Sequence, residues 1–113
     1  MKMSPEETAL SFAKYCMGWA DASQIAIEYT DAVVIKRKSN NYFHPSNLTE
    51  VFSAVMAYLT KHDHTLVTTF RKEPPVEGKP GDWTVQIDGE YEVEGDDLGK
   101  ALMECCIQAA KKQ

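Results

Sequence analysis

Residues 47–70 read NLTEVFSAVMAYLTKHDHTLVTTF, and this stretch decides the fold class. Its first part spaces apolar side chains as on one face of a helix: Leu48, Val51, Phe52, Val55, Met56 and Leu59. After His62 the pattern changes to alternation, which places three side chains on one face of a strand: Leu66, Thr68 and Phe70. A helix followed directly by a strand predicts a domain that mixes α and β structure.

Capping signals mark the start of two helices. Asn47, with Glu50 three residues later, is a capping-box variant, and Ser46 is the competing cap. Near the N-terminus, residues 4–7 (Ser-Pro-Glu-Glu) supply a capping hydroxyl, a proline at the first helical position and a glutamate at the capping-box position. We expect this first helix to extend to about Met17.

The rest of the chain predicts four further elements. Residues 25–29 and 33–37 are rich in β-branched and aromatic residues and predict a hairpin, and residues 38–45 predict a loop. Residues 83–87 predict a strand, and residues 91–93 either continue it or form a fifth strand. A last helix starts near residue 96 or 97. The expected order is αββαββα in a single α+β domain spanning residues 1–113, with three helices and a mainly antiparallel sheet of four to five strands.

The first and last helices are apolar around most of their circumference. The polar positions of the last helix fall on one stripe: Lys100, Glu104, Gln108 and Lys111. A helix with so wide an apolar arc is usually covered on more than one side. Either these two helices pack on each other and on the sheet, or one of them meets a second copy of the chain. The sequence therefore leaves a homodimer open.

Composition and charge limit the classes of function. The chain has 113 residues, of which 43% are hydrophobic and 26% are charged, as is ordinary for a globular domain. Its net charge is −5 at pH 7, and its pI is about 5.1. This balance disfavours general nucleic-acid binding, which needs lysines and arginines to neutralise phosphates, and it suits cationic partners.

Three further features bear on the cellular compartment. The N-terminal residues carry early acidic groups and show no secretory signal, and no stretch approaches the ~20 apolar residues that a membrane span needs. The three cysteines are Cys16, Cys105 and Cys106, and an odd count with two adjacent members argues against a disulfide framework. We therefore expect a cytoplasmic protein without membrane contact.

Four short motifs, in order along the chain, resemble those of one known family. Residues 16–19 (Cys-Met-Gly-Trp) are similar to its Met-Gly-Trp element, and residues 45–48 (Pro-Ser-Asn-Leu) to its entry into a central helix. Residues 83–87 resemble its tryptophan-led strand, and residues 101–110 its closing helix. The family is the phage ABA-sandwich domain. The resemblance implies an α-β-α sandwich and a phage origin, with a bacterial host cell as location, and it implies no established activity.

Basic and aromatic residues cluster at residues 36–44. Lys36, Arg37 and Lys38 precede Tyr42-Phe43-His44. Cations beside aromatic rings can hold phosphates and stack bases, so this segment is the first candidate site for a small anionic ligand such as a nucleotide signal. The alternative is an edge strand that its charges protect from unwanted pairing.

Acidic residues alternate near the end of the predicted sheet. Glu90, Glu92 and Glu94 would lie on one face of a strand, roughly 6.6 Å apart, with further aspartates on either side. A regular acidic row can compete for a basic, nucleic-acid-binding surface. The alternative is a solvated outer face of the sheet.

Other reactive residue types do not form a recognisable catalytic motif. His62 and His64 have the spacing for one face of a strand, but a zinc site needs a third protein ligand, and none is obvious. Cys105 and Cys106 point about 100° apart on a helix and are expected to be buried thiols. Nucleotide-binding and hydrolase motifs are absent from the sequence. We therefore predict no catalytic residue, no metal and no cofactor.

Four hypotheses about function follow. The leading hypothesis is a small phage accessory protein that acts by binding a host protein and inhibits a defence or nucleic-acid-handling protein. The second is a nucleotide binder that uses residues 36–44. The third is an RNA-binding module, since the second half has the element order of a double-stranded-RNA-binding domain, but residues 96–100 (Asp-Asp-Leu-Gly-Lys) replace the basic cluster expected there. An enzyme is the fourth and weakest.

Overall fold

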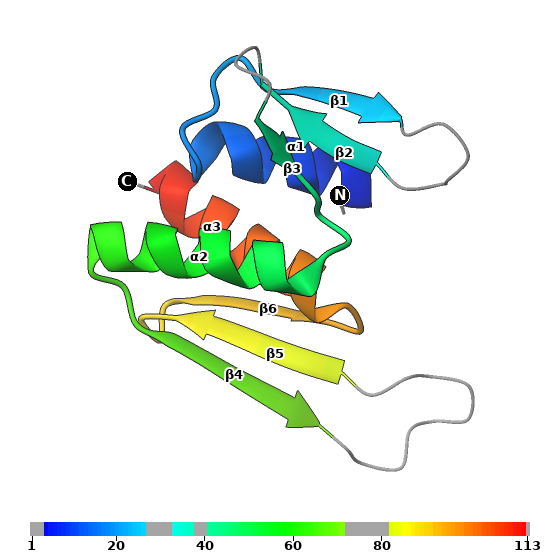
Figure 1. Ribbon diagram of the computed structural model, residues 1–113. Coiled ribbons are helices and arrows are strands. Elements are labelled where there is room, and N and C mark those ends of the chain that lie inside the picture. The colour runs from blue at the N-terminus through cyan, green and yellow to red at the C-terminus, as the bar shows by residue number, and fades with distance from the viewer. Residues whose placement is uncertain (1–3, 27–32, 38–40, 72–81, 113) are drawn as a thin grey trace, which may run out of the picture.

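The computed structural model describes residues 4–26, 33–37, 41–71 and 82–112 of the chain. Three helices alternate with strands (Figure 1). The helices are α1 (Pro5–Tyr15), α2 (Leu48–His62) and α3 (Leu98–Lys112). The strands are β1 (Ser23–Ala26), β2 (Val33–Lys36), β3 (Tyr42–Phe43), β4 (Leu66–Arg71), β5 (Asp82–Ile87) and β6 (Tyr91–Gly95). The chain thus has the α+β class, the three helices and the antiparallel pairing that the sequence predicts.

The strands form two sheets, and this corrects the expected single sheet of four to five strands. The orders are β1-β2-β3 and β4-β5-β6, and every pairing is antiparallel. The helices lie between the sheets, because α1 contacts β1 and β2 while α3 contacts β5, β6, α1 and α2 (Figure 1). The layering is therefore sheet, helices, sheet. In the expected α-β-α sandwich, the helices would instead cover both faces of one sheet.

The additional strand β3 falls in the segment predicted as a loop. Phe43 lies opposite Ile35 in the register, and its side chain is 2% exposed. Its ring contacts the Phe12 ring of α1, with 5.8 Å between centroids. Burial of this aromatic ring against α1 favours the short pairing of β3 with β2, although two residues give no periodic signal in the sequence.

Both helix starts are capped as predicted. The Ser4 Oγ accepts a hydrogen bond from the Glu7 backbone N–H at 3.2 Å. The Asn47 side chain accepts from the backbone N–H groups of Thr49 and Glu50, which identifies Asn47 as the cap of α2. The α1 helix ends at Tyr15, two residues before the expected end at Met17.

The core is centred on α3. Its buried side chains are Ala101, Leu102, Met103, Cys105, Cys106, Ile107 and Ala109. The wide apolar arcs of α1 and α3 thus meet each other and the sheets within one chain, which is the first of the two packings that the sequence allows. None of the helices in the described residues is long and apolar enough to cross a membrane.

Candidate functional site

In the first candidate site, at residues 36–44, Lys36 and Arg37 contact two different aromatic rings. Lys36 ends β2 and lies opposite Tyr42 of β3. Its ammonium group lies 5.9 Å from the centroid of the Tyr42 ring, within the range of a cation–π contact. The ring itself is 48% exposed. Lys36 and Tyr42 therefore form a small surface pair at the edge of the first sheet.

Arg37 belongs to a different contact. Its guanidinium carbon lies 5.4 Å from the centroid of the Trp19 ring, and its Nε lies 3.7 Å from the Asp21 carboxylate. Arg37 is thus neutralised and half-buried. The structure does not bring the Arg37 and Lys36 charges together over one ring, and Lys38 lies outside the described residues. The Trp19 contact spans 18 positions of sequence, and no local pattern indicates it.

The second candidate site forms a continuous exposed surface. Glu92 and Glu94 lie on the outer face of β6, while Tyr91 and Val93 face α3. Glu90 was expected on the same strand face, but it belongs to the turn between β5 and β6 and precedes the first residue of β6. Besides Asp88, which contacts His64, five exposed carboxylates extend from this turn to the start of α3. We call them the acidic strip: Glu90, Glu92, Glu94, Asp96 and Asp97.

The acidic strip has few compensating charges. No basic residue occurs between positions 88 and 97. Gln86 of β5 donates a hydrogen bond to Glu92 at 3.1 Å, and the Asp97 carboxylate accepts the Lys100 backbone N–H at 3.2 Å. Lys100 itself pairs with Glu104 at 3.5 Å. The strip therefore presents a row of negative charge to solvent.

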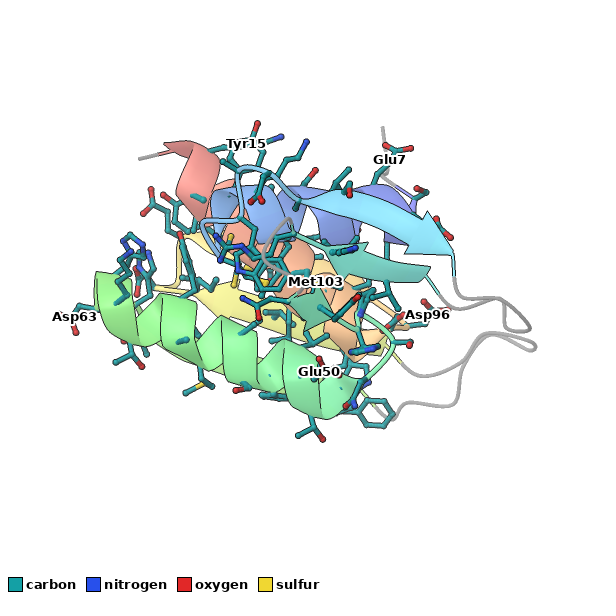
Figure 2. All side chains as sticks on the ribbon, turned by 45° about the horizontal axis from the view of Figure 1, so that its top comes forward. Glu7, Tyr15, Glu50, Asp63, Asp96 and Met103 are labelled. Atoms are coloured by element: carbon teal, nitrogen blue, oxygen red, sulfur yellow. The ribbon has the colours of Figure 1, made fainter. Side chains whose placement is uncertain are left out.

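A hollow of about 70 Å³ lies at the end of the acidic strip. It is lined by Val93, Glu94, Gly95, Asp96, Asp97, Lys100, Ala101 and Glu104. Four of these eight residues are acidic and one is basic. A space of this size has room for a few water molecules or for the charged end of a lysine or arginine side chain. Figure 2 shows Asp96 at this end of the molecule, beside the start of α3.

The thiols of Cys105 and Cys106 are buried, that of Cys16 is half-buried, and all three are poor nucleophiles. Burial raises the pKa of Cys16 to about 12 and that of Cys105 to about 11, and it raises the pKa of Cys106 further. The Cys105 thiol also donates to the Tyr91 and Val85 carbonyls at 3.4 and 3.6 Å. Since the thiolate is the reactive form, these thiols are unsuited to nucleophilic chemistry. Cys105 and Cys106 pack as small apolar side chains, as the sequence predicts.

The histidines form an aromatic cluster at the end of α2. The rings of His62 and His64 are 6.0 Å apart, and Tyr58 lies 4.6 Å from His62. The His64 Nδ1 lies 2.6 Å from the Asp88 carboxylate, which also accepts the Thr65 backbone N–H at 2.7 Å. Within the described residues, no three histidines, cysteines or acids are placed to hold a metal ion. This cluster joins α2 to the β5–β6 turn.

Comparisons with protein families, with curated proteins and with solved structures find no match to this chain. The resemblance to the phage ABA-sandwich domain therefore stays a prediction from four short motifs. The acidic strip is the candidate site that combines exposure, charge and a rigid support.

Proposed function

We propose that this protein acts by binding a partner protein through the acidic strip, and that the partner presents a basic surface. The observation that carries the proposal is the row of five exposed carboxylates with no basic residue among positions 88–97. Charge complementarity of this kind steers association and selects partners. The net charge of −5 adds to the attraction for a cationic surface.

The packing of β6 on β5 and α3 favours a role of the acidic strip in recognition over a role in solubility alone. β6 pairs with β5 over five residues and packs on α3, so the backbone that carries Glu92 and Glu94 is held in place. The hollow beside Asp96 and Asp97 has the size and charge to accept a lysine or arginine tip from the partner. A backbone that is already ordered loses less conformational entropy on binding than a mobile one.

The class of partner follows from the charge. Proteins that handle nucleic acids carry basic surfaces for phosphates, and an acidic strip can occupy such a surface in place of the nucleic acid. Together with the motif resemblance, this favours a phage accessory protein that inhibits a host defence or nucleic-acid-handling protein. A nucleotide ligand at Lys36 and Tyr42 stays the alternative, since the exposed Tyr42 ring could stack a base.

A charge-reversal pull-down tests the proposal. The wild type and the double variant Glu92→Lys/Glu94→Lys are immobilised, incubated with bacterial host lysate, and the retained proteins are identified by mass spectrometry. The control Glu6→Lys/Glu7→Lys makes the same change in charge on α1, which contacts the other sheet. We expect the wild type and the control to enrich a basic protein that the strip variant loses. No enriched protein, or equal enrichment by the strip variant, would contradict the proposal.

A further inference from the structure

The two edges of the β4-β5-β6 sheet differ in charge. β6 carries Glu92 and Glu94, the kind of charged side chain that protects an edge from pairing. β4 pairs with β5 only, among the described residues, and its other side is an edge. Positions 65–70 of this edge (Thr-Leu-Val-Thr-Thr-Phe) carry no charge, and the Val67 and Phe70 side chains are 50% and 46% exposed.

The backbone of this edge has a definite pattern of free groups. The Asp88 N–H donates to the Thr65 carbonyl at 2.8 Å, and these two residues extend the register of Leu66 opposite Ile87. In an antiparallel pair, hydrogen-bonded positions alternate with positions whose backbone groups point away from the partner strand. The N–H and C=O groups of Leu66, Thr68 and Phe70 therefore point outward from the sheet.

The neighbouring face of α2 is also uncharged. Four of its exposed residues are Thr49, Ser53, Met56 and Thr60. An open groove of about 400 Å³ lies between the helix and the start of β4, and its lining residues are Met56, Leu59, Thr60, Asp63, His64 and Leu66. Met56 is 48% exposed. Together the outer edge of β4 and this face of α2 form one surface, which we call the β4–α2 surface.

We propose that the β4–α2 surface binds a second copy of this chain, so that two β4 strands pair antiparallel across a two-fold axis at Thr68. This register places Leu66 opposite Phe70 of the second copy, and each outward-facing pair exchanges two hydrogen bonds. The apolar side chains of both copies then share one layer beneath the two α2 helices. The β4-β5-β6 sheets of the two copies then join into one continuous sheet of six strands, three from each copy.

Self-association fits this surface because its backbone pattern is symmetric and positions 65–70 of the edge carry no charge. Two copies of net charge −5 repel each other, and the acidic strip lies along the opposite edge of the same sheet. The β4–α2 surface brings the copies together where positions 65–70 contribute no charge, and depletion of charge is typical of the centre of an interface. An isologous dimer also needs a patch that complements itself, and an antiparallel strand centred on one residue does so.

This location differs from the dimer that the sequence leaves open. The apolar arcs of α1 and α3 are already covered within one chain, so they leave no comparable face for a second copy. The unpaired edge becomes visible only when the strand order is known.

Sedimentation equilibrium up to about 100 µM measures the association directly. We expect the wild type to sediment at twice its monomer mass of 12.7 kDa. Thr68→Pro removes an outward N–H without touching the ladder to β5, and Met56→Lys adds charge to the groove; both are expected to weaken association at least tenfold. The matched control Ala57→Lys, on the side of α2 away from the groove, and the strip variant Glu92→Lys/Glu94→Lys are expected to stay dimeric.

A crosslinking measurement keeps the proposal testable should either variant fold poorly. Residues that face each other in a hydrogen-bonded antiparallel pair have Cα atoms about 5.5 Å apart, within disulfide range. We expect Thr68→Cys to form a covalent dimer under mild oxidation and Thr69→Cys to remain uncrosslinked. A monomeric wild type at the highest concentration, or a dimer in which Thr68→Cys does not crosslink, would overturn the proposal. Neither outcome bears on the acidic strip.

Discussion

Asp88 connects two elements that lie far apart in the sequence. Its carboxylate accepts the Thr65 backbone N–H and contacts the His64 ring, and it does so from a turn residue with a φ of 56°. Asp88 and His64 are separated by 24 positions in the sequence, so no local pattern could predict their contact. The Arg37–Trp19 contact was unpredictable for the same reason. Sequence patterns identify residue types, whereas the partner of each polar group depends on the tertiary fold.

The Asp88 contacts predict a pH dependence of stability. In the folded state, the hydrogen bond from the Thr65 backbone N–H and, to a smaller extent, the contact with His64 hold the pKa of Asp88 below its ordinary value of 3.8. The stability that Asp88 adds is therefore fully present above the unfolded pKa and is lost as the pH falls through the lower, folded pKa. We expect Asp88→Asn to lower the free energy of unfolding at pH 7 and to flatten its decline below about pH 4.

Urea unfolding followed by circular dichroism at several pH values measures this effect. Glu90→Gln removes a carboxylate from the same turn and is the matched control, which should keep the wild-type pH profile. An Asp88→Asn profile parallel to that of the wild type would show that the Asp88 contacts contribute nothing to folding.

At the scale of single elements, the sequence predicted helices better than strands. The caps Ser4 and Asn47 and the apolar spacing of α2 are local signals, and the structure confirms them. The short strand β3 depends on Phe43 meeting α1, which is a tertiary contact. The choice of two sheets over one also depends on which strands pair, and alternation within a strand carries no information about its neighbour.

At the same scale, the charges at the start of α3 weigh against the RNA-binding hypothesis. The order α2-β4-β5-β6-α3 is the order that the sequence suggested for the second half. However, the first turn of α3 follows Asp96 and Asp97 and contains Lys100, which pairs with Glu104. Phosphate binding needs several uncompensated cations, so this end of α3 suits a basic partner better than a nucleic acid.

The two adjacent thiols of α3 allow a matched test of how this helix is buried in the core. Cys105 has two carbonyl acceptors within 3.6 Å, and Cys106 has no acceptor among the described residues. A serine hydroxyl is costly to bury without a partner. We expect Cys106→Ser to lower the free energy of unfolding by about 1–3 kcal/mol and Cys105→Ser by less. Chemical denaturation of both variants measures the difference, and equal losses would contradict this account of α3.

At the scale of the whole molecule, charge is distributed unevenly over one rigid sheet. One edge carries the acidic strip, and the other edge, at positions 65–70, carries no charge. Figure 2 shows Asp63, beside the groove, and Asp96, beside the hollow, at opposite ends of the molecule. Binding of a basic partner and binding of a second copy can therefore occur together, because they use separate surfaces.

Carbodiimide crosslinking in host lysate tests the proposed role of the strip most directly, since it joins a carboxylate to a lysine amine only where the two are in contact. Mass spectrometry then identifies which carboxylates have reacted with another protein. We predict that the crosslinks concentrate on Glu92, Glu94, Asp96 and Asp97, with Glu6 and Glu7 of α1 unmodified. Crosslinks spread evenly over all exposed carboxylates, or confined to α1, would contradict the account.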